Sequence, residues 1–453
     1  MIKLHIRTLS ALIVLLLCAA VLSSCGAKEN AALPASDADI ESVTDLTETD
    51  CPPADIPLLN LDFAEALIAE NEKEPDSFTV QMGGDILFHD TVINASRIKK
   101  TNQFSVAPYF SEFSDVFVSD LNIVNLETPV DVNGGNKGII GYPAFNMPYE
   151  VLPALKSIGV DLVTTATNHT PDKGYKGVCN TLKNVRKAGL IPVGTFETKE
   201  DRDKLCILEI NGIKVGVASY TTYTNGSLPE KYSFAVNKCG YKYDAIVKYV
   251  VPQIKKLREN GAEFIIVAMH WGKEYEDKPD DRMKKTAKAL CEAGADIIAG
   301  SHPHCIQPIE YLTVDRDGKE SKALVIYSMG NLFANQTGLY KPKTQEAMIV
   351  SVKAQRDEDG KVHITDAFYT PTFSYVRGGK GDNYMRLICS GEFKDGDTRP
   401  GIFKDDKGWK TCKKAWTNVT NKLGTVIPCV ASPKDYPEGF FDLSSTDLSS
   451  GDI

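Results

Sequence analysis

The chain has 453 residues, of which 42% are hydrophobic and 25% charged, enough for one large or two medium-sized globular domains. This composition excludes a disordered or collagen-like protein. The formal net charge is −9, from 60 acidic and 51 basic residues. A general nucleic-acid-binding protein presents a basic face, so we expect no nucleic-acid partner.

The first 24 residues have the features of a secretory signal. Two basic residues precede an apolar run over 9–22, which is shorter than the roughly 20 residues that span a bilayer. The stretch Leu22-Ser23-Ser24-Cys25 resembles the lipobox of bacterial lipoproteins, in which the cysteine is lipidated. A plain secretory signal that contains a cysteine is the alternative. We therefore predict a lipoprotein signal peptide over 1–24, and a protein anchored through lipid on Cys25 at the extracytoplasmic face of the cell membrane.

The negative charge is concentrated outside the predicted folded body. Residues 26–60 contain eight acids and one lysine, and we predict a flexible acidic stalk over 25–60 because such a segment buries little apolar area. The last twenty residues hold five acids and one base, which leaves residues 61–433 without net charge. We predict one main domain over 61–375 and a C-terminal extension over 376–453 that ends in a loose acidic tail, with docking of Phe440 and Phe441 on the core as the alternative.

The cysteine count argues against a zinc knuckle or a dense disulfide framework. There are eleven cysteines, and nine remain once Cys18 and Cys25 are set aside, with no Cys-x-x-Cys pair. A bridge among Cys389, Cys412 and Cys429 stays open, since spacing alone does not assign one.

Strand-like apolar runs alternate with amphipathic helical stretches up to about residue 300. This alternation predicts an α/β fold, and later hairpins add an antiparallel portion, so we expect mixed (α+β) sheets. One hairpin, over 205–220, turns at Asn211-Gly212, a pair suited to a type I′ turn. The other expected elements are strands at 78–88, 121–126, 161–166, 191–194, 264–269, 296–299 and 323–328, helices at 150–158, 175–188, 244–260 and 281–293, and a hairpin pairing 347–354 with 362–369.

Five of the predicted strands end in side chains of the types that serve as metal ligands. In open α/β sheets the chemistry lies beyond the carboxyl ends of the strands. Carboxylates and imidazoles are ligands of zinc, manganese and iron, and one carboxylate can bridge two ions about 4 Å apart. The residues at these strand ends are Asp85, Asn125, Glu127, Asn168, His169, His270, His302 and His304.

The segment Ser301-His302-Pro303-His304-Cys305 places two of these histidines close in sequence. Residues two apart in an extended chain point the same way, so we expect both imidazoles to face one cavity. A turn with solvent-facing rings is the alternative. Cys305 should then point away from the cavity and act as a small buried residue.

Six motifs, in order and spacing, resemble the CapA-type proteins of bacterial poly-γ-glutamate capsule synthesis, whose fold is similar to that of calcineurin-like metallophosphoesterases. The resemblance spans about residues 76–336 and implies a metallophosphoesterase-like layered α/β/β/α sandwich. The motifs are GGDILFHD (83–90), NLETPV (125–130), TNHTPDKG (167–174), HWGKEY (270–275), GSHPHCIQPIE (300–310) and YSMGNLFANQ (327–336).

The resemblance also implies roles for individual residues at a site with two divalent ions of manganese, zinc or iron. Asp85 matches the acid that holds one ion, Glu127 the bridging carboxylate and His169 the catalytic proton donor. The remaining implied metal ligands are Asn168, His270, His302 and His304. One departure matters: the related motif is Asp-x-His, and Leu87 stands here in place of the histidine. The first ion is therefore expected to be weakly held or absent unless His89 reaches it.

Three hypotheses for the function follow. The first is a membrane-tethered CapA-type protein that supports synthesis, export or anchoring of an anionic γ-linked glutamate polymer, with membrane subunits of capsule synthesis as partners. The second is an extracytoplasmic metal-dependent phosphoesterase acting on phosphodiesters or nucleotides. The third is a non-catalytic scaffold lipoprotein with a degenerate metal site. Trp271, Glu274 and Tyr275 lie at the same predicted strand end and either bind polymer or support the site.

Overall fold

The structure, a computed structural model, describes residues 77–132, 138–316, 318–336, 342–379 and 382–442. All of these described residues belong to one compact unit. The predicted signal peptide, Cys25 and the stalk lie outside the described residues, as do residues 443–453. Within the described ranges, no helix combines the length and the apolar character needed to cross a membrane.

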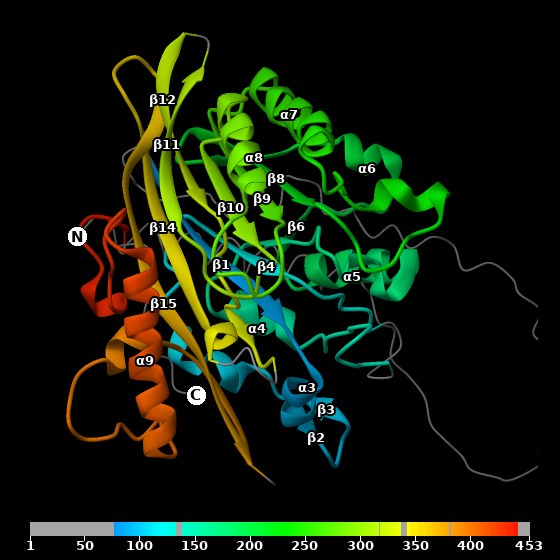
Figure 1. The fold of residues 1–453 in the computed structure, drawn as a ribbon. Coiled ribbons are helices and arrows are strands. Elements are labelled where there is room, and N and C mark those ends of the chain that lie inside the picture. The colour runs from blue at the N-terminus through cyan, green and yellow to red at the C-terminus, as the bar shows by residue number, and fades with distance from the viewer. Residues whose placement is uncertain (1–76, 133–137, 317, 337–341, 380–381, 443–453) are drawn as a thin grey trace, which may run out of the picture. The chain divides into compact units, whose positions relative to one another are not determined.

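The core consists of two β-sheets (Figure 1). The eight-stranded first sheet has the order β16-β15-β14-β1-β4-β5-β6, with β13 paired to β1, and its strands β1, β4, β5 and β6 are parallel. Its strands are β1 (Ser77–Leu87), β4 (Leu121–Leu126), β5 (Leu162–Thr164), β6 (Ile191–Val193), β13 (Phe333–Ala334), β14 (Glu346–Arg356), β15 (Val362–Gly379) and β16 (Asp382–Cys389).

The six-stranded second sheet has the order β11-β12-β10-β9-β8-β7, and β8, β9, β10 and β12 run parallel. Its strands are β7 (Cys206–Ile210), β8 (Ile213–Thr221), β9 (Phe264–His270), β10 (Ile297–Ser301), β11 (Ile309–Arg316) and β12 (Lys319–Ile326). A short ribbon pairs β2 (Arg97–Ile98) with β3 (Gln103–Phe104).

Three apolar clusters define four layers. One cluster lies between the sheets, where Val80 and Met82 of β1 are buried with Ile266 of β9. A second joins the outer face of the first sheet to α3 (Asp90–Ser96), α4 (Val151–Ser157) and the 3-10 helix Ala107–Phe113. A third joins the second sheet to α7 (Tyr243–Glu259) and α8 (Asp281–Glu292). The predicted α/β/β/α layering is confirmed.

Most elements predicted before residue 300 are present at nearly the predicted bounds. The 205–220 hairpin is confirmed, and Asn211 (φ 49°) and Gly212 (φ 77°) both take the left-handed conformation that a type I′ turn requires. Helix α7 continues through Pro252. The helix expected at 175–188 is α5 (Gly174–Lys187), and α6 (Lys199–Asp203) was not predicted.

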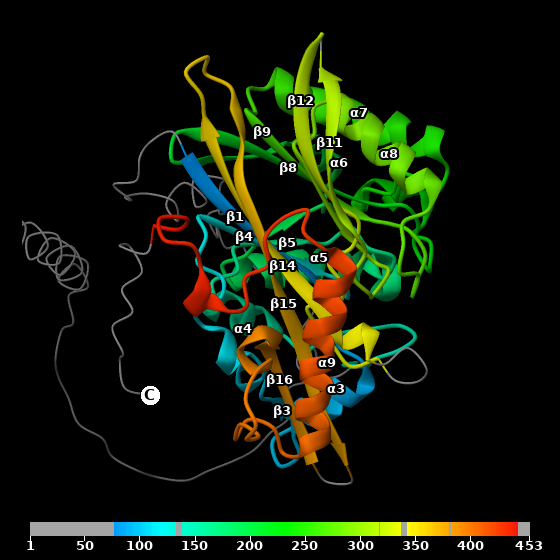
Figure 2. The same cartoon turned by 60° about the vertical axis from the view of Figure 1, so that its left-hand side comes forward.

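The C-terminal part forms more structure than we predicted. The division expected after residue 375 falls inside β15, which continues to Gly379 and pairs with β16. Helix α9 (Asp406–Leu423) lies along β15 (Figure 2) and buries Trp409 in a cluster with Phe373 and Tyr375. The chain after 375 therefore completes the first sheet.

The expected loose tail needs a correction up to residue 442. Phe440 and Phe441 are buried, with ring centroids 4.7 and 6.0 Å from that of Phe368 on β15. These two aromatic rings fix the first part of the acidic tail to the sheet, because burying them removes a large apolar area from water. No disulfide joins Cys389, Cys412 and Cys429, which are free thiols.

Candidate metal centre

The candidate ligands gather where the parallel strands of both sheets end. Asp85 lies near the end of β1, Glu127 directly follows β4, and His270 is the last residue of β9. A contact of 2.9 Å between Asn168 Oδ1 and His270 Nε2 links the two sheets. A second contact, 3.4 Å, links Asp85 Oδ2 to His304 Nδ1. The strand ends thus converge as expected for open α/β sheets.

Among the described residues, three sets of side chains could hold a metal ion. Within each set, the donor atoms lie within 4.8 Å of one another. Glu127 belongs to two of the sets, which is the arrangement that a bridging carboxylate requires. All members are buried except Glu274, which is half-buried. The sets are Asp85, Glu127 and His304; Glu127, His270 and His302; and Glu274, His302 and His304.

The surroundings of the Glu127 carboxylate show whether the site fits a cation. Both of its oxygens are buried and neither has a hydrogen-bond partner, while His304 Nε2 lies 3.6 Å and His270 Nε2 3.8 Å from Oε1. A buried carboxylate without donors is costly, and a divalent ion offsets that cost. Asn168 Nδ2 and His302 Nδ1 are also buried without a partner. The residues present therefore fit a divalent metal.

The ionisable groups perturb one another strongly. Burial raises the pKa of Glu127 well above its usual value. Burial, and then the neighbouring histidines, lowers the pKa values of His270 and His302 well below normal. Burial also acts to lower the pKa of His304, but Glu127 and Asp85 outweigh it and raise that pKa to about 10.

Hydrogen bonds behind the ligands fix their orientation. Asn125 Nδ2 donates to Asp85 Oδ1 at 2.8 Å, and Ser301 Oγ lies 2.9 Å from His270 Nδ1. Asn331 Oδ1 lies 2.9 Å from His304 Nδ1, and Tyr223 Oη lies 3.0 Å from His302 Nε2. Such contacts set the tautomer and the direction of a ligand.

Tyr223 and Asn331 were not predicted as site residues. A signal for Tyr223 exists in the sequence, because it follows β8, whose carboxyl end lies beside that of β9. Asn331 lies in the 327–336 motif, but its role depends on a contact 27 residues away, which sequence spacing does not show.

His302 and His304 converge for a different reason than predicted. Strand β10 ends at Ser301, and both histidines have left-handed backbones, with φ of 95° and 59°. The segment is therefore a tight turn and not an extended strand, yet the two rings lie 5.9 Å apart and face the same site. Cys305 is buried and its Sγ donates to the Glu276 carbonyl, as expected for a residue that is not a ligand.

His169 lies beside the ligands and is held by an acid. Its Nδ1 is 2.8 Å from Asp172 Oδ2, which also accepts the backbone N–H of Phe145. The ring of Phe145 stands at right angles to that of His169 at 4.6 Å. The Asp172 side chain therefore orients the histidine. Asn225 Nδ2 lies 3.3 Å from His169 Nε2.

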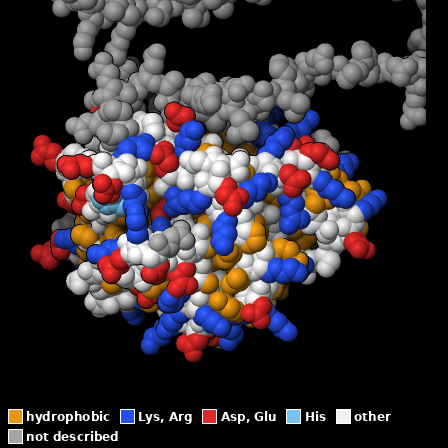
Figure 3. All heavy atoms as spheres, turned by 90° about the horizontal axis from the view of Figure 1, so that it is seen from above, with side chains coloured by type: hydrophobic (Ala, Val, Ile, Leu, Met, Phe, Trp, Pro, Cys, Tyr) orange, Lys and Arg blue, Asp and Glu red, His pale blue; other side chains and the backbone are white. Residues whose placement is uncertain are grey.

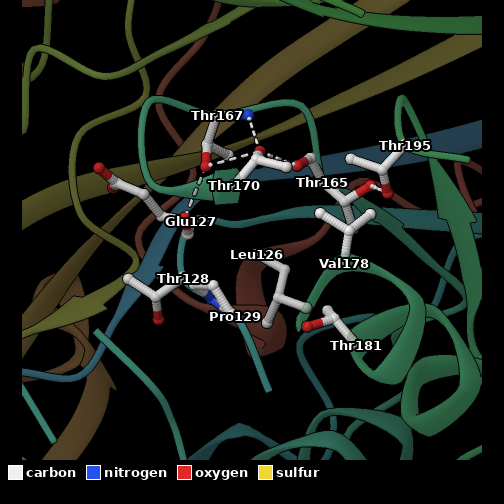
Figure 4. A pocket seen from close by; sticks show the side chains of 10 residues that line it. All are labelled: Leu126, Glu127, Thr128, Pro129, Thr165, Thr167, Thr170, Val178, Thr181 and Thr195. Atoms are coloured by element: carbon white, nitrogen blue, oxygen red, sulfur yellow. Dashed lines mark hydrogen bonds between the residues drawn. The ribbon is translucent and has the colours of Figure 1, made fainter. Parts of the chain in front are cut away.

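A small cavity lined by threonines lies behind Glu127 (Figure 4). The Glu127 carboxylate points away from it, while Thr167 Oγ1 donates to the Glu127 carbonyl at 2.6 Å. Thr170 Oγ1 accepts from the Thr167 N–H and donates to the Thr165 carbonyl. These bonds tie the end of β4 to the loop that carries Asn168 and position the carboxylate from behind.

Residues 79–336 match the family described as "Bacterial capsule synthesis protein PGA_cap". The chain belongs to this family. It is 28% identical over 278 residues to capsule biosynthesis protein CapA of Bacillus anthracis, covering 60% of this chain and 63% of that protein. It is 26% identical over 290 residues to PGA biosynthesis protein CapA of Bacillus subtilis, covering 61% and 72%. The match thus spans less than two thirds of the Bacillus anthracis protein.

Two solved structures align with parts of this PGA_cap family member. Haemophilus influenzae NAD nucleotidase aligns with a TM-score of 0.37 at 11% identity, covering 79% of this chain and 64% of the other. Thermus thermophilus sulfate thiohydrolase SoxB aligns with a TM-score of 0.30 at 13% identity, covering 66% and 43%.

The expected departure after Asp85 is visible in this member of the PGA_cap family. Leu87 is buried in an apolar cluster with Phe145 and Ala334, so no imidazole occupies that position. His89, which we considered as a replacement, belongs to none of the donor sets among the described residues, and its ring contacts Phe145 at 5.2 Å.

Proposed function

We propose that this protein is a lipid-anchored extracytoplasmic member of its family that supports synthesis, export or anchoring of poly-γ-glutamate through a dinuclear metal site. Family membership and the names of the two Bacillus relatives, both of which refer to capsule or PGA biosynthesis, support the role in polymer formation. The lipobox-like segment at Cys25 supports the anchor. The observation that carries the metal site is the buried Glu127 carboxylate, which has no donor and lies between two histidines.

The chain's own residues divide between two ions. Asp85, Glu127 and His304 would hold one, and Glu127, Asn168, His270 and His302 the other. The donor set of carboxylates and imidazoles suits manganese, zinc or iron. When bound, such ions polarise a phosphoryl or acyl centre and lower the pKa of a coordinated water towards neutrality.

His169 is the residue that would move a proton. Asp172 accepts the hydrogen bond from His169 Nδ1, so a second proton on Nε2 is the one available to a leaving oxygen. Packing against Phe145 keeps the ring in this orientation and limits the access of water. The imidazole is thus prepared to act as a general acid beside the metal ligands.

Hydrolysis of phosphodiesters or nucleotides is the second candidate, and the pairing of a metal donor set with the His169–Asp172 dyad favours it. The full chain, supplied with manganese, zinc or iron, is expected to cleave an aryl phosphodiester, and a chelator is expected to abolish turnover. If none of the three metals supports turnover that a chelator abolishes, the phosphoesterase function is excluded.

The polymer role is tested in a host that forms poly-γ-glutamate. Deleting the gene is expected to reduce surface polymer, and the parent gene is expected to restore it. A Glu127→Gln gene is expected not to restore it, because that change removes the shared carboxylate. Unchanged surface polymer after deletion contradicts the proposal, whereas restoration by Glu127→Gln supports the third possibility, a non-catalytic scaffold.

A further inference from the structure

The acidic loop after β9 contains a carboxylate that our prediction did not assign to the metal site. Glu274 lies with His302 and His304 in a donor set whose atoms are within 4.8 Å of one another. We infer that Glu274 is a further ligand of the metal cluster, in which Leu87 supplies no donor. This inference rests on the proposed metal site and specifies which residues complete it.

The backbone around Glu274 is fixed on both sides. Trp271 donates its N–H to the Ser301 carbonyl at 3.1 Å, and Tyr275 donates its N–H to the Pro303 carbonyl at 2.8 Å. Gly272 (φ 89°) and Tyr275 (φ 65°) take left-handed conformations that bend the loop. These bonds hold the 271–275 segment alongside the turn that carries the two histidines.

The acids of this loop differ in what they contact. Glu276 is exposed and pairs with Lys273 at 2.9 Å, and Asp277 pairs with Lys422 at 2.7 Å. Glu274 is half-buried, and its carboxylate makes no hydrogen bond or ion pair with another described residue. Lys273, its neighbour in sequence, pairs with Glu276 instead. Only Glu274 of these three acids therefore faces the histidines.

A second observation at the same place points to a ligand. His302 is 1% exposed, and its Nδ1 is buried without a hydrogen-bond partner. A buried ring nitrogen without a partner costs free energy unless a proton donor or a cation meets it. A carboxylate beside two imidazoles is a donor set that manganese, zinc and iron accept.

A metal ion at Asp85 needs more ligands than the three side chains around it provide. Zinc takes four ligands, and manganese and iron favour sites with more oxygen donors. The set of Asp85, Glu127 and His304 offers only three, because Leu87 is apolar and buried. Glu274 also lies close enough to His304 and Glu127 to raise the pKa of both. Glu274 shares His304 with this set and His302 with the other, so it is placed to add a donor to the cluster beside both histidines.

The test measures metal binding directly. The full chain is dialysed against graded Mn²⁺, and bound metal per chain is determined by elemental analysis alongside the electron paramagnetic resonance spectrum. The parent is expected to bind two ions, and Glu274→Gln is expected to bind one of them about 100-fold more weakly or not at all, as loss of a ligand or its support does elsewhere. Glu276→Gln, which changes the same charge two residues away, is expected to match the parent.

Glu274→Asp separates a ligand from a structural residue. This variant keeps a carboxylate on a shorter side chain, so its affinity for the ion that Glu274→Gln binds more weakly is expected to lie between those of the parent and Glu274→Gln. Equal metal loss in both variants, together with equally lowered unfolding temperatures of their metal-free forms, would indicate a structural role and overturn the inference.

The outcomes also distinguish this inference from the proposed function. If Glu274→Gln binds two ions with the affinity of the parent, the inference is wrong and the dinuclear site stands. If the parent itself binds no Mn²⁺, Zn²⁺ or Fe²⁺, both are wrong.

Discussion

Glu127 is the residue on which the electrostatics of the site depend, because its buried carboxylate lies within 4 Å of two imidazoles and has no hydrogen-bond donor. Sequence position alone marked it as a strand-end acid. Its burial between His270 and His304, which makes an uncompensated charge costly, is a property of the assembled sheets.

The pH dependence of stability should reveal the proton on His304. Its pKa is raised to about 10, so above about pH 6.5 the folded state retains a proton that the unfolded chain releases. The free energy of unfolding of the metal-free protein is expected to fall from pH 7 to 8.5, by up to about 1.4 kcal/mol per pH unit. The raised pKa of Glu127 acts in the same direction. Urea unfolding measures this slope.

His304→Gln provides the control for that slope. Without the imidazole, the fall over this pH range is expected to shrink, whereas an unchanged slope would contradict the assignment. Metal affinity of the parent is expected to change in the opposite sense and rise with pH, because ligands must lose protons to bind an ion.

His169→Ala separates proton transfer from metal binding. If the protein cleaves an aryl phosphodiester, this variant is expected to lose about 10²- to 10⁴-fold in kcat, the usual contribution of a general acid. Bound Mn²⁺ per chain should not change, since His169 belongs to none of the donor sets. Steady-state kinetics and metal analysis on the same preparation test both expectations, and loss of metal in this variant would contradict the assigned role.

Among the elements, β1 owes its position to a close approach that only glycine allows. A Cβ at Gly84 would lie 1.9 Å from the Gly330 carbonyl oxygen, which accepts the N–H of Asp85 at 2.9 Å. Gly84→Ala is expected to reduce the free energy of unfolding by about 1–3 kcal/mol, as overpacking does, and to weaken metal binding by displacing Asp85. Denaturant unfolding measures the first effect.

Gly401→Ala is the matched comparison, because a Cβ there meets no atom within 4 Å and the residue has no left-handed φ. Its stability is expected to equal that of the parent. Equal stability of both alanine variants would show that the contact at Gly84 relaxes freely.

The C-terminal elements should be required for folding. A chain that ends at residue 375 cuts β15 and removes β16 and α9, which leaves Phe373 and Tyr375 without their partner Trp409. We expect this chain to aggregate or to lose its cooperative thermal transition, measured by circular dichroism and gel filtration. A chain that ends at residue 442 keeps Phe440 and Phe441 and is expected to melt like the parent. A cooperative transition in the shorter chain would contradict the prediction.

At the scale of the whole molecule, the folded body has no net charge to attract a polyanion. On the face seen in Figure 3, basic and acidic side chains are interspersed over the surface. Under the proposed function, attraction for an anionic polymer or phosphoester would have to arise locally, and divalent ions held at the strand ends would be the strongest local source.

The proposed membrane anchor is tested by replacing the sulfur atom of Cys25 with oxygen. Cys25→Ser is expected to prevent incorporation of radiolabelled palmitate and to shift the protein from the membrane fraction to the soluble extracytoplasmic fraction. Cys18→Ser lies within the predicted signal peptide and is expected to behave as the parent. Palmitate labelling of Cys25→Ser would contradict the anchor.

The sequence by itself determined the alternating strands and helices of an α/β fold up to residue 300 and the edge of the sheets at which the candidate ligands meet, because strand periodicity and strand-end position are local properties. Only the tertiary structure decided that β16 completes the first sheet and that α9 packs against β15. It also decided that left-handed backbones turn His302 and His304 into the site and that Asp172 orients His169. It also brought Glu274 to those histidines. The physical reason is that these features depend on contacts between segments far apart in the chain, which no local pattern encodes.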